Sequence, residues 1–203
     1  ESGTEDLDGS NTIELEAAYT SGSTISWSTG ATADSIFVTS AGEYTATVEL
    51  NGCSTTKTLN IYEPIYVAKT NSDGTAASNT SGDGTLATPY LTIQKGIDEA
   101  NDGGKVYVLP GTYEEQVLIT KGLYLTSNFD RLNDSSALHT TIIEPGSSSK
   151  IEDANNSSKY SYGGLSVVNT TGDVKVSGFT VKDFEVFYEN EWRAGAISIN
   201  DNY

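Results

Sequence analysis

Residues 105–125 read KVYVLPGTYEEQVLITKGLYL, and this stretch decides the fold class. Short runs rich in β-branched and aromatic residues occupy 106–108, 117–119 and 123–125. A Pro-Gly pair and a Lys-Gly pair separate them, and the runs are too short and too closely spaced for ordinary helices. The stretch therefore predicts short strands joined by tight turns, in an architecture that repeats such strands along the chain.

The composition of the whole chain agrees with this interpretation. Of 203 residues, 36% are hydrophobic, 20 are glycine and none is methionine. Serine, threonine and asparagine are abundant, a mixture typical of strand-and-turn proteins rather than helical bundles. A chain of this length can hold one or two domains with cores of their own.

The chain is strongly acidic, with 28 Asp and Glu against 11 Lys and Arg and a net charge of −17. Nucleic acids and anionic membranes would be repelled, so we expect neither as a partner. The charge favours cations such as Ca²⁺ or neutral partners, or it serves solubility alone. No segment is apolar for long enough to cross a membrane, so we expect no membrane insertion.

The two ends of the sequence bear on where the protein works. The first residues, ESGTEDLDGSN, lack the basic and apolar regions of a signal peptide, but a processed secreted protein begins in the same way. The last residues, AGAISINDNY, stop just after a strand-like run. We therefore expect a piece of a longer secreted or cell-surface protein whose signal peptide has been removed.

Residues 1–62 alternate apolar and polar positions in short segments with turn signals between them, which predicts five to seven strands of a β-sandwich. Trp27 lies in the middle of one predicted strand, where it either packs in the core or stacks on a ligand. Tyr44 follows Gly42 at the start of another, as in a tyrosine corner. The clearest segments are 13–17, 25–27, 36–38, 44–48 and 58–61.

The stretch ISWSTGATADSIFVTSAGEYTATVELNGCS resembles the immunoglobulin-like modules of secreted bacterial surface proteins. The resemblance implies an immunoglobulin-like β-sandwich over residues 1–62. In such modules a cysteine at the place of Cys53 often pairs with one near the first strand, but that region here reads Asp6-Leu7-Asp8. Cys53 is the single cysteine of the chain, so the disulfide is missing or its partner lies outside this sequence.

Glu63-Pro64 marks the start of a second domain, residues 63–203. After a polar loop at 71–85, apolar residues recur with a helical period, which predicts one helix over 92–102 with Thr92 as its N-cap. Beyond it the helical period does not return, and we expect only strands. The segment GGLSV at 163–167 aligns with GAISI at 195–199 at an offset of 32, within the range of solenoid repeats.

The order of residues 65–125, followed by TTIIEP and GDVKVSGFTVKDF, resembles the opening of pectin-lyase-like right-handed parallel β-helix proteins. The resemblance implies that the helix covers the apolar end of the first coil. The expected fold class is all-β: an immunoglobulin-like β-sandwich followed by the N-terminal coils of a right-handed parallel β-helix with a capping α-helix. Polysaccharide lyases, hydrolases and large adhesins share this opening, so it implies a scaffold and not an activity.

Two segments carry candidate binding residues. The loop NSDGTAASNTSGDGT is rich in oxygen ligands, and Asn71, Asp73 and Asp83 are tentative calcium ligands, with a plain turn as the alternative. The segment FEVFYENEWR mixes rings with acids, and its residues either contact a sugar or pack against the solenoid or a following domain. The tentative carbohydrate contacts are Phe187, Tyr188, Glu189, Glu191, Trp192 and Arg193.

No catalytic residue is predicted. A lyase of the β-helix type needs acidic ligands with an Arg or Lys one coil away, and no such cluster is visible. His139 is the single histidine and is expected in a surface turn. Glu114 and Glu115 are expected in a turn as solvated surface, although paired carboxylates can serve glycoside hydrolysis.

Two functions stay open at this point. The favoured one is non-enzymatic: a bacterial surface protein that acts as an adhesin, a carbohydrate binder or a structural component, with a polysaccharide or another surface or secretion-system protein as partner. The alternative is the N-terminal part of a polysaccharide lyase, or a related carbohydrate-active enzyme, whose active site lies in later coils.

Overall fold

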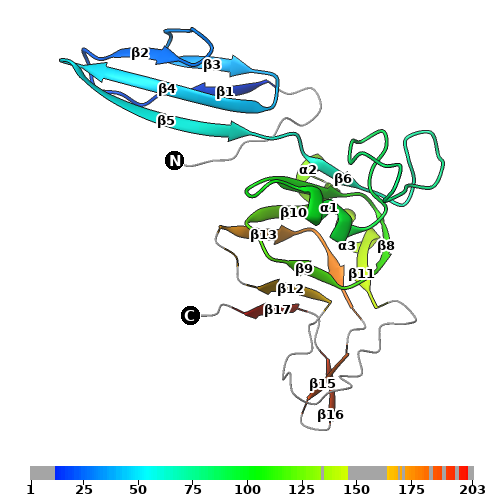
Figure 1. Ribbon diagram of the computed structural model, residues 1–203. Coiled ribbons are helices and arrows are strands. Elements are labelled where there is room, and N and C mark those ends of the chain that lie inside the picture. Colours follow the sequence, from blue (N-terminus) through cyan, green and yellow to red (C-terminus); the bar gives the residue numbers. More distant parts are fainter. Residues whose placement is uncertain are drawn as a thin grey trace. The chain divides into compact units, whose positions relative to one another are not determined.

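The computed structural model describes residues 12–133, 135–145, 164–168, 170, 172–182, 185–188, 191–194 and 197–200, the last three ranges by their backbone. Strands hold 45% of the residues and helices 11%, so the chain is all-β with few helices. The chain separates into two compact units, an N-terminal unit, Glu1–Pro64, and a C-terminal unit, Ile65–Tyr203 (Figure 1).

The described part of the N-terminal unit forms two antiparallel sheets, and each clearly predicted segment falls on one strand. One sheet has the order β2-β4-β5 and the other pairs β1 with β3. The strands are β1 (Ile13–Glu16), β2 (Thr24–Trp27), β3 (Ser35–Val38), β4 (Gly42–Leu50) and β5 (Cys53–Ile61).

The hairpin between β4 and β5 follows from its turn residues. Leu50 pairs with Cys53, so the loop consists of Asn51 and Gly52 alone. Both have positive φ, 52° and 78°, as a type I′ turn requires. Asn and Gly tolerate this backbone conformation better than other residues, which is why the dipeptide fixes the pairing of two nine-residue strands.

The two sheets of the N-terminal unit share one apolar core. Trp27 is 5% exposed, and its Nε1 donates to the Ala33 carbonyl at 2.9 Å, so the ring is a core residue and no ligand platform. The Tyr44 hydroxyl donates to the Ser40 carbonyl at 2.8 Å, the backward hydrogen bond of a tyrosine corner. The buried members of the core are Ile13, Leu15, Ala17, Ile25, Trp27, Ile36, Val38, Ala46 and Ile61.

The C-terminal unit is built on three parallel sheets. The first joins β6 (Ile65–Val67), β7 (Lys105–Val108), β10 (Leu123–Ser127) and β13 (Val174–Ser177). The second joins β8 (Gly111–Glu114), β11 (Thr141–Glu144) and β14 (Thr180–Val181). The third joins β9 (Val117–Ile119), β12 (Leu165–Val168) and β17 (Ile197–Asn200).

From β7 onward the chain visits the first, second and third sheets in turn and then returns to the first (Figure 1). The predicted offset of 32 is confirmed, because Leu165 pairs with Ile197 where β12 meets β17. Other rounds differ in length, since Lys105 of β7 pairs with Tyr124 but Leu123 of β10 pairs with Val174. These unequal rounds explain why the sequence shows only one clear repeat.

Alternate residues of the parallel strands fill a second apolar core. Val106, Val108 and Leu125 are fully buried in it, while their neighbours Tyr107 and Tyr124 lie on the outer face of the first sheet, as the pleat requires. Tyr113 of β8 is fully buried too, and its hydroxyl donates to the Leu109 carbonyl at 2.8 Å.

Three predictions for this unit need correction. The helix α1 (Ile93–Glu99) begins after Thr92 as predicted, but its C-cap is Ala100, so it is shorter than 92–102. Two more helices, α2 (Asn128–Leu132) and α3 (Ala137–Thr140), occur where only strands were expected, because helices of about one turn are too short to show a period. Residues Gly111–Glu114 form β8 rather than a turn.

The glycine inside α1 has a packing role. A Cβ at Gly96 would lie 2.5 Å from Val67 Cγ2 and 3.2 Å from Val106 Cγ1. The missing side chain therefore lets the helix backbone approach β6 and β7 closely, where Ile93 and Ile97 are buried. This contact offsets the weak helix propensity of glycine.

Candidate functional site

Glu115 fastens the beginning of α1 to the coil. Its Oε1 accepts from the Ile93 N–H at 2.8 Å and its Oε2 from the Gln94 N–H at 2.9 Å. These N–H groups have no partner within the helix, so the carboxylate satisfies two donors that would otherwise be unpaired. Burial raises the pKa of Glu115, and these two hydrogen bonds oppose that rise. The prediction of solvated surface holds for Glu114, which is exposed, and is wrong for Glu115.

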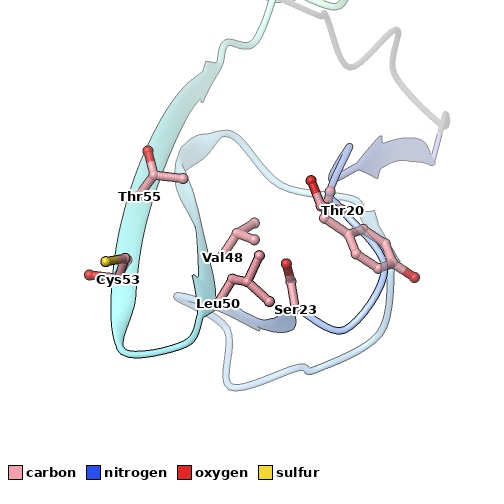
Figure 2. Close-up of a pocket in the computed structure, with 8 residues that line it drawn as sticks. Thr20, Ser23, Val48, Leu50, Cys53 and Thr55 are labelled. Carbon is pink, nitrogen blue, oxygen red and sulfur yellow. The ribbon is translucent and has the colours of Figure 1, made fainter.

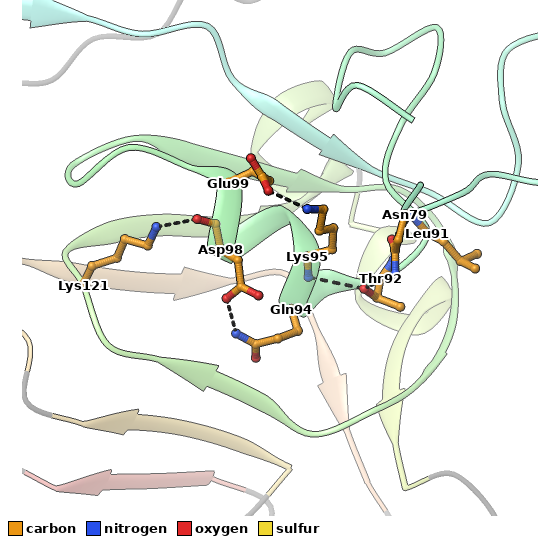
Figure 3. A network of polar contacts seen from close by, with 8 residues as sticks. All are labelled: Asn79, Leu91, Thr92, Gln94, Lys95, Asp98, Glu99 and Lys121. Atoms are coloured by element: carbon orange, nitrogen blue, oxygen red, sulfur yellow. Dashed lines mark hydrogen bonds and ion pairs between the residues drawn. The ribbon is translucent and has the colours of Figure 1, made fainter. Parts of the chain in front are cut away.

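A second group of side chains precedes the helix (Figure 3). Asn79 Oδ1 accepts from the N–H groups of Leu91 and Thr92 at 2.9 and 3.1 Å. The Thr92 hydroxyl accepts from the Lys95 N–H at 3.3 Å, which makes it the N-cap that the sequence predicts. The polar loop before α1 is thereby tied to the helix through Asn79.

Two further side chains join α1 to the strand β9 and the turn after it (Figure 3). Gln94 donates to the Leu118 carbonyl at 3.1 Å and accepts from the Leu118 N–H at 2.8 Å, so it pairs with β9 as a neighbouring strand would. Lys121 Nζ donates to the carbonyls of Asp98 and Ala100 at 3.0 and 2.6 Å, at the C-terminal end of the helix. These groups hold the scaffold together and offer no reacting atom.

The tentative calcium ligands lie in two similar turns. Asp73 Oδ1 accepts from the N–H and hydroxyl of Thr75 at 2.9 and 2.6 Å. Asp83 Oδ1 accepts the same pair from Thr85 at 3.0 and 2.8 Å, and also the Thr88 hydroxyl. The Thr88 hydroxyl, followed by the Thr85 groups, lowers the pKa of Asp83 to about 2.

These contacts account for both aspartates as turn residues. Asn71 donates its Nδ2 to the Thr75 hydroxyl at 2.8 Å, while its buried Oδ1 has no hydrogen-bond partner among the described residues. Within the described residues no three His, Cys, Asp or Glu side chains gather as metal ligands would. Calcium binding by Asn71, Asp73 and Asp83 stays a prediction.

The tentative carbohydrate residues fall on an antiparallel ribbon, β15 (Glu185–Tyr188) and β16 (Glu191–Ala194), which the chain forms between β14 and β17 (Figure 1). Phe187 pairs with Trp192 in the ribbon, Tyr188 with Glu191, and Val186 with Arg193. Glu189 lies outside the described residues. The backbone therefore brings five of the six predicted residues into one short element.

A shallow open pocket of about 300 Å³ lies in the N-terminal unit (Figure 2). Val48, Leu50 and Cys53 of β4 and β5 line it together with Tyr19 and Ser23. Cys53 is exposed and unpaired, as a chain with one cysteine requires. No titratable pair or oxyanion-binding arrangement accompanies the thiol among these lining residues, so the pocket offers a surface and no chemistry.

The outer face of the first parallel sheet carries a row that the sequence analysis missed. Lys105, Tyr124 and Lys175 occupy one register position on β7, β10 and β13, and we call them the tyrosine–lysine column. The Lys105 and Lys175 ammonium groups lie 5.3 and 4.3 Å from the centre of the Tyr124 ring. Lys175 is exposed, and the other two are half-buried. Two cations thus flank one ring on a strongly acidic protein.

The neighbouring register position continues this face. Tyr66 and Tyr107 stack with ring centres 5.5 Å apart, and the Arg131 guanidinium lies 5.6 Å from the Tyr66 ring. Asp130 accepts from the Thr126 hydroxyl at 3.1 Å, so α2 is tied to the sheet it follows. The signal in the sequence was the alternation of each run, but the unequal rounds hid which residues become neighbours.

The remaining candidate, His139, is exposed in α3 rather than in a turn. Among the described residues no helix is long and apolar enough to cross a membrane. Comparison of the chain with family models, curated proteins and solved structures finds no match.

Proposed function

We propose that the protein is a secreted or cell-surface protein in which an immunoglobulin-like module precedes the first coils of a right-handed parallel β-helix. Two antiparallel sheets around one core and the Tyr44 hydrogen bond support the module. The cyclic visit to three parallel sheets supports the β-helix, and parallel crossovers are nearly always right-handed. In this proposal α1 is the capping helix, because it packs on the first coil through Ile93 and Ile97.

Within this scaffold we propose that the ribbon β15–β16 binds carbohydrate, as in an adhesin or a structural surface component. The observation that carries the proposal is the pairing of Phe187 with Trp192 on an element inserted between β14 and β17. Aromatic rings stack on the apolar faces of sugars, and neighbouring acids such as Glu191 accept hydrogen bonds from sugar hydroxyls. An inserted ribbon leaves the parallel pairing of the coils intact, so it can vary with the ligand.

A polysaccharide-binding screen tests this proposal. The chain is applied to immobilised neutral and uronate polysaccharides, and binding of Trp192→Ala and Phe187→Ala is compared with that of Tyr19→Ala, which removes an exposed ring elsewhere. We expect both ribbon variants to lose binding at least about tenfold, since stacking contributes on the order of 1 kcal/mol or more for each ring. Equal binding by Trp192→Ala and the native chain would overturn the assignment to the ribbon.

The same screen separates the binding protein from the alternative, the N-terminal part of a polysaccharide lyase. The native chain and the longest protein that contains it are incubated with uronate polysaccharides, and the ultraviolet absorbance of an unsaturated product is followed. Product formed by the longer protein alone would favour the lyase. Parallel incubations with calcium and with a chelator test whether Asn71, Asp73 and Asp83 bind the ion, with isothermal titration as the direct measurement.

A further inference from the structure

The tyrosine–lysine column has features of a docking surface that the proposed function does not use. Its charges lie on neighbouring strands, so the two lysines are about 10 Å apart at the backbone, twice the spacing of strands in a sheet. Tyr124 lies between them, with its hydroxyl 3.2 Å from Ser177 Oγ. A complementary surface would present an apolar ring with carboxylates beside it.

The N-terminal unit carries such a surface on the outer face of β1 and β3. Phe37 is 68% exposed, the largest exposed fraction among the large hydrophobic residues described. Glu14 pairs with Phe37 directly across the two strands, and Glu16 lies two residues further along β1. Both glutamates are exposed, and Ser35 donates its hydroxyl to Glu14 at 2.7 Å. We call Glu14, Glu16 and Phe37 the Phe37 face.

We propose that the Phe37 face of one molecule docks on the tyrosine–lysine column of a second copy. The two surfaces match in kind: a ring between cations meets a ring beside anions, and the spacing of both is set by strand geometry. Directly opposite residues in an antiparallel pair have Cβ atoms about 5 Å apart, so Glu14 and Phe37 can contact Lys175 and Tyr124 together.

Charge distribution favours a second copy as the occupant. Residues 1–64 contain ten acidic residues and one lysine, so the N-terminal unit is an anionic partner for a face that presents two lysines. The surfaces differ from each other, so the contact is head-to-tail, and repeated contacts build a chain of molecules rather than a closed dimer.

The expected association is weak and depends on salt. The net charge of −17 on each copy repels at long range, and the small interface with partly solvated charges gives a dissociation constant on the order of 100 μM. Salt of about 0.1 M screens the long-range repulsion beyond ~10 Å while contacting pairs still attract each other. Near 1 M, where the screening length is ~3 Å, the attraction is lost as well.

Sedimentation velocity with exchanged charges tests the proposal. Variant one carries Lys105→Glu and Lys175→Glu, and variant two carries Glu14→Lys and Glu16→Lys. We expect the mean mass of the native chain to rise above 21.5 kDa between about 10 μM and about 1 mM, while each variant alone stays monomeric. Mixing the two variants restores association, because each new glutamate surface then meets a new lysine surface.

Controls separate this contact from a general effect of charge and from the proposed function. Glu43→Lys with Glu49→Lys makes the same change in net charge at exposed positions of β4, and it should associate like the native chain. The single variant Lys175→Glu, at an exposed position, replaces variant one if that protein does not fold. Trp192→Ala should retain association, and both charge variants should retain polysaccharide binding.

A native chain that stays at 21.5 kDa across the whole range would overturn the proposal. Folded variants that fail to associate when mixed would overturn it too, as would equal loss of association in the β4 control. Loss of polysaccharide binding in Trp192→Ala with association retained supports both proposals, since each depends on a different surface.

Discussion

The two units of this protein join their strands in different ways. In the N-terminal unit, β4 and β5 are neighbours in the sequence, and a two-residue turn fixes their register. In the C-terminal unit, paired strands are separated by 19 residues at Lys105 and Tyr124 and by 51 residues at Leu123 and Val174. Pairing across such distances needs interactions outside the strands, and the polar contacts of α1 with Asn79, Glu115 and Lys121 supply them.

The difference teaches where each unit is sensitive to change. The N-terminal unit depends on a buried ring between two small sheets, so removing volume should unfold it. The first coil of the C-terminal unit depends on α1, whose backbone groups are satisfied by side chains from residues distant in the sequence. Four predictions follow this contrast, from the largest expected effect to the smallest.

Trp27→Ala should unfold the N-terminal unit alone. Truncating a large buried ring costs about 3–5 kcal/mol, which is comparable to the whole stability of a small domain. Hydrogen exchange should show loss of amide protection in β4 and β5 while β7 and β10 stay protected. Phe37→Ala, which removes an exposed ring, serves as the control and should change stability by less than about 0.5 kcal/mol. Loss of protection in both units together would contradict their independence.

Glu115→Ala should loosen α1 by about 2–3 kcal/mol, because two N–H groups lose a partly buried acceptor. Glu115→Gln keeps one acceptor oxygen and should lose about half as much. Denaturant unfolding measures the loss, and exchange of the Ile93 and Gln94 amides locates it. The matched control is Glu114→Ala, at an exposed position next along the chain. Similar losses at 114 and 115 would mean that the carboxylate does not hold the helix.

Gly96→Ala should destabilise the protein by about 1–2 kcal/mol although alanine favours helices by about 1 kcal/mol. The reason is the contact of 2.5 Å between a Cβ at this position and Val67 Cγ2. A peptide of residues 90–102 gives the opposite sign, because it has no β6 to clash with, and its helicity should rise on the same substitution. Circular dichroism of the peptide and thermal unfolding of the protein measure the two effects. A more stable Gly96→Ala protein would refute the close approach.

Asp83 and Glu115 should give stability opposite dependences on pH. The pKa of Asp83 falls from 3.8 to about 2 in the folded chain, so its contribution is present above 3.8 and is lost as pH falls through about 2. The pKa of Glu115 is raised above 4.5 by burial, so its contribution is complete below 4.5 and decreases as pH rises through the folded value.

The measurement is the free energy of unfolding of the native chain relative to Asp83→Asn and to Glu115→Gln across this pH range. The difference from Asp83→Asn should shrink toward low pH, and the difference from Glu115→Gln should shrink toward high pH. Thr88→Val removes the largest cause of the Asp83 shift and should move its transition upward. Two differences that change in the same direction would show that one of the environments is misassigned.

Much of the strand and turn layout could be predicted from local sequence. Asn51-Gly52 predicts a hairpin, Thr92 predicts a helix start, and the alternation around Trp27 predicts a buried position. The short helices α2 and α3 could not be predicted, because one turn leaves no periodic pattern. Of the candidate sites, the sequence identified Phe187 and Trp192 as a group but did not show that they pair across a ribbon.

The sequence by itself determined an acidic, strand-rich chain, the turn at Asn51-Gly52 and the start of α1, because charge, alternation and turn chemistry act within a few residues. Only the tertiary structure decided the partners of Glu115 and the row formed by Lys105, Tyr124 and Lys175. Those contacts join residues separated by unequal lengths of chain, and no local preference specifies which distant strands become neighbours. The stretch at 105–125 shows both levels: its strands follow from its own residues, and the role of Glu115 follows from the helix packed against them.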